Sequence, residues 1–171
     1  EGAFTGPMTT PGNPLIYDVR IAECEPVMTL EFGEVNAESN TLDVIINSPT
    51  PLGNFQFDIQ GLSIAEVFGG LAGENGYELS TNGSTILGYN LQGTTIPAVQ
   101  GILFTLEYEE VNASQLCFEP GSGAFTGNVD TPGTPEILPV LFGSCLENWT
   151  DCSGEYYGDA LTDDCGNCDA D

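Results

Sequence analysis

The last 21 residues of the chain carry the side chains best suited to chemistry. Residues 151–171 read DCSGEYYGDALTDDCGNCDAD, with three cysteines among closely spaced aspartates and few apolar residues. The aspartates are Asp151, Asp159, Asp163, Asp164, Asp169 and Asp171. Such a segment buries too little apolar surface to fold alone, so it needs disulfides and a metal. Because carboxylates are ligands that Ca²⁺ prefers, we predict Ca²⁺ as the cofactor, held by these six side chains.

The same segment follows the pattern DCxGxxxGxAxxDxCGxC, which resembles the aspartate- and cysteine-rich calcium repeats of the thrombospondin type 3 kind. It lacks the DxDxDG core and the final glutamate of an EF-hand. One alternative is a disordered acidic tail. Another is zinc at Cys165 and Cys168, which form a CxxC pair near Cys152, although the chain has none of the histidines that structural zinc sites often use.

Catalysis has little support. Without histidine, neither a Ser-His-Asp nor a Cys-His arrangement can form. Paired carboxylates can cleave glycosidic bonds, but a chain with 26 acidic residues contains such pairs by chance. The single tryptophan, Trp149, does not indicate an aromatic-lined cleft. We therefore predict that the protein is not an enzyme.

Charge limits the partners. The net charge is −25, with Arg20 the only basic residue, so the surface repels nucleic acids and anionic lipids. No apolar run is long enough to insert into a membrane. Six cysteines, an even number, favour an oxidising compartment, and we expect a secreted or cell-surface protein. Three sequons are candidate glycosylation sites: Asn82, Asn112 and Asn148.

One stretch of the sequence occurs twice. Residues 2–24, the first copy, read GAFTGPMTTPGNPLIYDVRIAEC, and residues 123–145, the second copy, read GAFTGNVDTPGTPEILPVLFGSC. They align without a gap at an offset of 121 positions. Turn residues followed by an apolar run that ends in cysteine predict a loop leading into a terminal strand. Because a domain needs its last strand once, the first copy is either the remnant of a preceding sister domain or a spare strand for a neighbouring molecule.

Short strands dominate the rest of the chain. In residues 53–61, Phe55, Phe57 and Ile59 alternate with polar residues, which is typical of a half-buried strand. Other strands are predicted at residues 15–22, 27–32, 41–47, 76–80, 84–91, 101–110 and 115–120, with the last supplied by the second copy. Paired glycines in residues 62–75 favour a short helical turn or a loop. About nine strands predict an all-β fold, an antiparallel β-sandwich of the jelly-roll type.

The runs PLGNFQFDIQGLSIAEVFGG, GYELSTNGSTILGYNLQGTTIPA and GILFTLEYEE resemble cohesin-like jelly-roll domains, relatives of bacterial carbohydrate-binding sandwiches. The resemblance covers about residues 26–145 and implies the sandwich fold. In such domains a late-strand cysteine often pairs with one at the domain end, which implies a disulfide between Cys117 and Cys145. The cysteines alone allow 15 pairings. Four stay unassigned: Cys24, Cys152, Cys165 and Cys168.

The predicted organisation has three parts. Residues 1–24 are the repeat strand, residues 25–145 the cohesin-like sandwich, and residues 146–171 the irregular segment stabilised by disulfides and calcium. The favoured hypothesis is a structural subunit of a surface filament, whose partners are copies of itself joined head-to-tail by strand addition. The alternative is an adhesion module of a larger tandem-repeat protein that binds glycans or a dockerin-like protein, although the strands lack the exposed aromatic row of cellulose binders.

Overall fold

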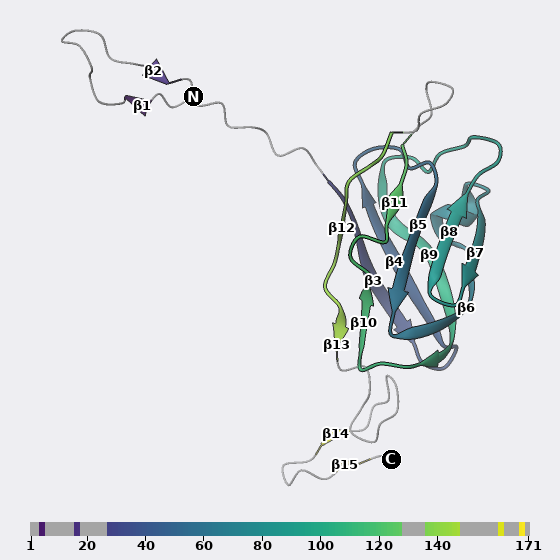
Figure 1. Cartoon of the computed structure of the whole chain (residues 1–171). Coiled ribbons are helices and arrows are strands. Elements are labelled where there is room, and N and C mark those ends of the chain that lie inside the picture. Colours follow the sequence, from purple (N-terminus) through teal and green to yellow (C-terminus); the bar gives the residue numbers. More distant parts are fainter. Residues whose placement is uncertain are drawn as a thin grey trace.

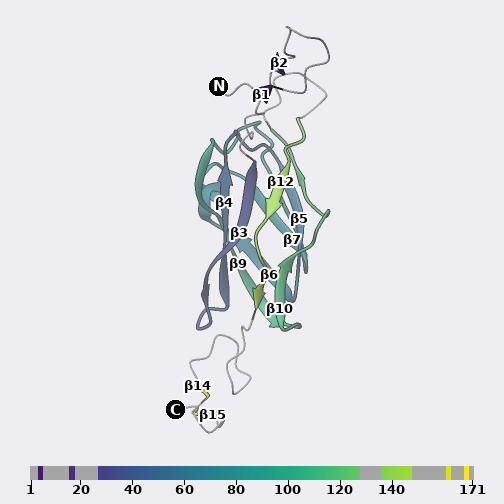
Figure 2. The same ribbon diagram turned by 90° about the vertical axis from the view of Figure 1, so that its left-hand side faces the viewer.

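The computed structural model describes residues 27–127 and 136–147 in full, and the backbone pairing of residues 4–5, 16–17, 161–162 and 168–169. The two long stretches form a sandwich of two β-sheets, seen from two sides in Figures 1 and 2. Nearly all of the regular structure is β, as the sequence predicts.

The first sheet has the strand order β12–β3–β4–β9–β6. Its strands are β3 (Met28–Asn36), β4 (Thr41–Ser48), β6 (Leu62–Phe68), β9 (Val99–Val111) and β12 (Val140–Phe142). The central strand β4 buries Leu42, Val44 and Ile46 completely. Ser48 is buried on the same face, and the side chains between these four are less buried, so the period of two in the sequence becomes one buried face.

The second sheet has the order β13–β10–β5–β8–β7, with β11 paired beside β5. Its strands are β5 (Phe55–Gln60), β7 (Glu78–Asn82), β8 (Thr85–Tyr89), β10 (Gln115–Phe118), β11 (Ala124–Phe125) and β13 (Leu146–Glu147). Strand β5 buries Phe55, Phe57 and Ile59, which is the alternation that the sequence predicts.

Aromatic rings fill the space between the sheets. The ring of Phe57 has five neighbouring rings with centroids at 5.7–6.3 Å. They belong to Phe55, Phe104, Phe118, Phe125 and Phe142. These five rings come from strands β5, β9, β10, β11 and β12, so a single side chain connects both sheets and the second copy of the repeat.

Residues 62–75 differ from the sequence-based prediction. The first half is strand β6, not a loop or a helical turn; only the second half is helical, as the short α1 (Gly70–Glu74). The pairing of β6 with β9 shifts register on both sides of Ile64. These irregularities interrupt the alternation of apolar residues and hide the strand in the sequence, although Ile64 and Val67 are buried.

The second copy of the repeat also differs from the prediction of one last antiparallel strand. It contributes two strands, β11 and β12, to different sheets. Strand β12 runs parallel to β3 and lies at its edge (Figure 2). The sandwich is therefore not antiparallel throughout. Alternation within one segment cannot reveal this, because the direction of a strand depends on where the chain crosses between the sheets.

Tyr77 ties two loops to the core. The side chain is 7% exposed, and its hydroxyl donates to a group of three carbonyl oxygens: those of Gly53 at 2.5 Å, Leu52 at 2.8 Å and Thr94 at 3.1 Å. Burial raises the pKa of Tyr77 above its ordinary value of 10.0. Burial also raises the pKa of Tyr108. Both phenols therefore stay protonated in the fold at pH values where they ionise in the unfolded chain.

We expect stability to fall in alkali. Because the raised pKa belongs to the folded state, stability is complete below about pH 10 and is lost as the pH rises from there toward the folded pKa. Tyr77→Phe should remove part of this loss. At pH 7 the free energy of unfolding of the variant should be lower by about 1–2 kcal/mol, because three carbonyls lose the hydroxyl that they share as donor. Urea unfolding between pH 7 and 11 measures both effects. An unchanged alkaline slope in the variant would show that Tyr77 does not cause the loss.

Two further strand pairs lie outside the sandwich strands. Strand β1 (Phe4–Thr5) pairs antiparallel with β2 (Ile16–Tyr17), and β14 (Leu161–Thr162) pairs antiparallel with β15 (Cys168–Asp169). Within the part of the chain that the structure describes, no helix combines the length and hydropathy needed to cross a bilayer.

Candidate assembly site

The second copy occupies a defined place on the sandwich, which we call the repeat slot: the positions of residues 123–127 and 136–145. At its first end, β11 pairs antiparallel with β5, and Phe125 lies opposite Phe55. The neighbouring Thr126 is held by hydrogen bonds to Gly53 and Asn54. Its carbonyl accepts from the N–H of Gly53 at 2.6 Å, its hydroxyl accepts from the N–H of Asn54 at 2.8 Å, and its own N–H donates to the carbonyl of Asn54 at 2.9 Å.

The second copy next folds back on itself. Thr126 forms an antiparallel bridge with Ile137. The N–H of Gly127 donates to the carbonyl of Glu136, and the N–H of Leu138 donates to the carbonyl of Phe125, both at 2.8 Å. These bonds form a hairpin register within the copy.

At its other end the second copy pairs with the edge of the first sheet. Along β12, Val140 lies opposite Met28 and Phe142 lies opposite Leu30, and the N–H of Gly143 donates to the carbonyl of Leu30 at 2.7 Å. The repeat slot thus spans both sheets. Strand β12 covers the edge of β3 with main-chain hydrogen bonds, which do not depend on side-chain identity.

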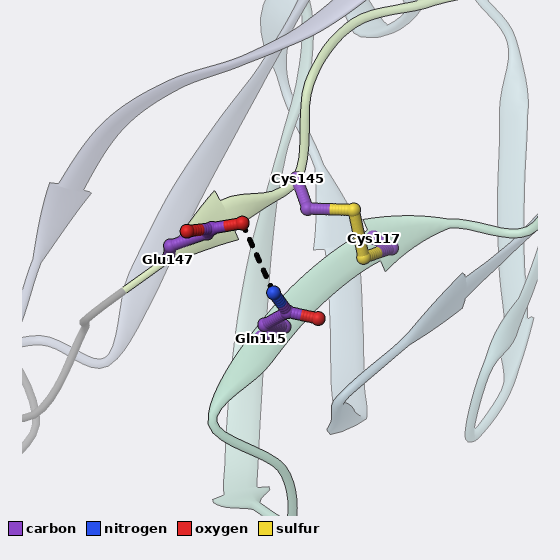
Figure 3. Close-up of a disulfide and its surroundings, with 4 residues drawn as sticks. All are labelled: Gln115, Cys117, Cys145 and Glu147. Atoms are coloured by element: carbon purple, nitrogen blue, oxygen red, sulfur yellow. Dashed lines mark hydrogen bonds between the residues drawn. A yellow bond between two sulfur atoms is a disulfide. The ribbon is translucent and has the colours of Figure 1, made fainter.

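A disulfide fixes the end of the slot. Cys145 is bonded to Cys117 of β10, the pair that the resemblance implies. Directly after it, β13 pairs with β10, and the amide of Gln115 donates to the carboxylate of Glu147 at 3.0 Å. Figure 3 shows this disulfide and hydrogen bond side by side. The second copy is thereby attached covalently to the sheet that contains β10.

The side chains of the slot divide into two sets. Four face the core: Phe125 and Leu138 are buried, and Val140 and Phe142 are partly buried against the core. At the offset of 121 positions, the first copy has Phe4, Tyr17, Val19 and Ile21 in these places. All four are apolar or aromatic, and Cys24 corresponds to Cys145. The first copy therefore carries the side chains that the inward positions require.

Several outward positions differ between the copies. Leu141 is 59% exposed, and Arg20 takes its place in the first copy. Pro139 and Ser144 are exposed, and acidic residues take their places in the first copy. Charged residues specific to the first copy thus fall where the slot faces solvent.

The first copy also repeats the hairpin. In it, Thr5 lies opposite Ile16, and Phe4 lies opposite Tyr17. At the offset of 121 positions, Thr5 and Ile16 correspond to Thr126 and Ile137, which form the antiparallel bridge of the second copy. The two copies therefore share one backbone register. The GAFTG motif indicated the repeat. The sequence did not show that Thr126 of this motif forms hydrogen bonds to the main chain, or that the motif pairs with β5.

The first copy cannot fill the slot of its own sandwich. The second copy already occupies that slot. In addition, Val19 would have to lie parallel to and opposite Met28, leaving only residues 22–27 to bring the chain back. A parallel pair needs a crossover of about a dozen residues or more, so this connection is too short.

The other residues predicted for sites are placed as follows. The side chains of the six aspartates proposed for calcium lie outside the described residues, as do those of Cys24, Cys152, Cys165 and Cys168, and Asn148. Asn82 and Asn112 are exposed, which glycosylation requires. Among the residues described with side chains, no group of three or more acidic or cysteine side chains gathers as a metal site. In the same residues, Phe68 at the end of β6 is the one exposed aromatic ring.

The sandwich resembles solved cohesin structures. One is a non-cellulosomal cohesin from the hyperthermophilic archaeon Archaeoglobus fulgidus, with 14% identity over 68% of this chain and 86% of that chain, and a TM-score of 0.48. Another is a chain of a CaDoc0917–CaCohA2 complex, with 16% identity over 67% of this chain and 100% of that chain, and a TM-score of 0.44. No family model matches the chain, and no curated protein matches it. At these identities the likeness extends to the fold alone.

Proposed function

We propose that this protein is an extracellular structural subunit whose sandwiches are joined head-to-tail into a filament by the first copy of the repeat. One observation carries the proposal. The two copies share a hairpin register and an inward apolar pattern, yet a sandwich has one repeat slot, filled by its own second copy. The first copy is suited to a slot, and the slot that it can reach belongs to another sandwich, whose own second copy it has to displace.

The direction of the joint follows from β12. A first copy in that position would run parallel to the acceptor's β3, and its Cys24 would lie at the acceptor's Cys145 end. Residues 25–27 alone then separate it from its own β3, which begins at Met28. The end of one sandwich thus leads directly into the start of the next. Such a contact uses two different surfaces and does not close on itself, so it extends into a fibre.

Electron microscopy of the 171-residue chain tests the proposal. The longest strand, β9, has 13 residues and spans about 43 Å at about 3.3 Å per residue. With so short a connection between sandwiches, we expect filaments with an axial repeat on the order of 40–50 Å. Single particles of uniform size, with and without calcium, would overturn the filament hypothesis.

Calcium is the proposed stabiliser of the joints. Each subunit carries a net charge of −25, so neighbouring subunits repel each other unless cations intervene. The C-terminal segment follows β13, at the Cys145 end of the slot. Its six aspartates, named above, would supply the carboxylate oxygens that Ca²⁺ takes as ligands. A chelator should therefore shorten or dissolve the filaments.

Calcium binding has its own test. Asp163→Asn with Asp164→Asn should weaken Ca²⁺ binding by about tenfold or more, because each change removes a charged ligand. Glu34→Gln with Glu38→Gln removes the same charge from exposed positions of the sandwich and should change binding little. Calorimetric titration with calcium chloride measures both. Equal weakening in the two variants would mean that total charge, not a site, attracts the ion.

The alternative is a module that binds a glycan or another protein. Its support is the sandwich fold alone. A flat sugar-binding face needs a row of exposed rings, and Phe68 is the single exposed ring among the residues described with side chains. We therefore favour assembly.

A further inference from the structure

We propose that residues 2–24 of one copy enter the repeat slot of a second copy, where Cys24 replaces Cys145 as the disulfide partner of Cys117. This inference rests on the proposed head-to-tail assembly and names its acceptor surface and its covalent bond. The occupant is a segment of this chain, and the acceptor is the sandwich of a second copy.

The backbone of the slot limits what can enter it. A side chain at Gly123 would place a Cβ atom 2.7 Å from the ring of Phe125 and 3.0 Å from the ring of Phe142. The first copy keeps glycine there, as Gly2. It also keeps the threonine whose hydroxyl accepts from the N–H of Asn54, as Thr5. The first copy thus matches the slot at Gly123 and Thr126. It differs at Gly143, which corresponds to Ala22, and a Cβ atom there would lie 3.0 Å from the Cγ atom of Glu31, an exposed side chain that has to shift.

Charge favours an exchange between copies. Arg20, the only basic residue of the chain, takes the place of Leu141, which lies opposite Thr29 of β3. Two residues along, on the same face of the strand, is Glu31, which is exposed. A diagonal neighbour of this kind is within reach of a long side chain. Arg20 of the entering segment would thus lie near a carboxylate of the acceptor.

The disulfide controls the exchange. While Cys117 and Cys145 are bonded, the second copy is attached to its own sandwich and competes for the slot at an effective concentration on the order of millimolar. Cys145 is exposed. The thiolate of Cys24 attacks the Sγ atom of Cys117, the bond to Cys145 breaks, and Cys145 leaves as a thiolate. One disulfide is replaced by another, so no oxidant is consumed.

Mixed isotopes show whether the new bond joins different chains. Full-length chains labelled with ¹⁴N and ¹⁵N are mixed, a trace of reduced glutathione starts thiol exchange, and iodoacetamide stops it. Digestion with a glutamyl endopeptidase and mass spectrometry then identify the linked peptides. We expect Cys24–Cys117 peptides that carry one light and one heavy partner, with Cys145 alkylated as a free thiol.

Two isoleucines of the first copy provide a matched pair of variants. Ile21 corresponds to Phe142, which packs against the core, whereas Ile16 corresponds to Ile137, which is 69% exposed. Ile21→Asp should lower the yield of the linked peptide by about tenfold or more, because it brings a charge to the inward face. Ile16→Asp adds the same charge on the outward face and should change the yield less than about twofold.

Each outcome decides the matter. Mixed Cys24–Cys117 peptides that depend on Ile21 but not on Ile16 support the proposal. Equal yields in both variants would indicate random thiol exchange and overturn it. It is also overturned if Cys117 stays bonded to Cys145 throughout. If filaments form in that last case, the head-to-tail function stands without this bond; if neither filaments nor linked peptides form, both proposals fail.

Discussion

Replacing Phe57 with alanine should lower the free energy of unfolding by about 3–5 kcal/mol. The Phe57 ring is fully buried, and rings from both sheets surround it. Alanine would leave a cavity that these rings cannot fill by small movements, since interiors are packed closely and each ring is held by its own strand. Denaturation by urea, followed by intrinsic fluorescence, measures the loss.

A second phenylalanine serves as the control for this prediction. Phe68 lies at the end of β6 and is 41% exposed. Phe68→Ala removes the same atoms from a position that water already reaches, and should cost less than about 1 kcal/mol. Similar losses in the two variants would mean that the ring cluster around Phe57 is not the centre of the core.

Removing the disulfide should have the second large effect. The bond joins residues separated by 28 positions. A disulfide that closes a loop of that length stabilises the fold by about 3–4 kcal/mol, chiefly by restricting the unfolded chain. Cys117→Ser with Cys145→Ser should therefore shift the urea midpoint to a clearly lower concentration. The hydrogen bonds of β12 and β13 stay available, so the variant should still fold at 25 °C.

The reduced wild-type protein is the comparison for the disulfide variant. Both should unfold at similar urea concentrations, because both lack the Cys117–Cys145 bond, and the other four cysteines lie outside the sandwich strands. A loss below about 1 kcal/mol in the double variant would mean that the unfolded chain is already compact around this loop. A double variant much less stable than the reduced protein would indicate that the serines, not the missing bond, disturb the fold.

The arrangement of the repeat slot is suited to carry mechanical load between joined sandwiches. In the proposed filament, the load passes along main-chain hydrogen bonds to β3 and β5 and, in the exchanged form, along a disulfide. Strand β12 is the edge strand of the first sheet, whereas β5 is the middle strand of the second. Strand addition also covers the edge of β3, which would otherwise be open to uncontrolled pairing with other chains.

The sequence by itself determined the class of fold and the repeat. Alternation in β5 placed Phe55, Phe57 and Ile59 on one face, because side chains along a strand point alternately to opposite sides. The two copies were visible because their motifs recur in order at one offset. The six aspartates of the C-terminal segment point to calcium by their chemistry alone, and this remains a prediction.

The tertiary structure decided what local pattern cannot express. Residues 62–68 form a strand because they pair with β9. This pairing includes register shifts, so the apolar residues of β6 do not alternate with a period of two. The tertiary structure divided the second copy between two sheets and made β12 parallel to β3, because strand direction depends on contacts between residues far apart in the chain. That parallel register is one reason why a segment so close to β3 in sequence cannot take the repeat slot of its own sandwich.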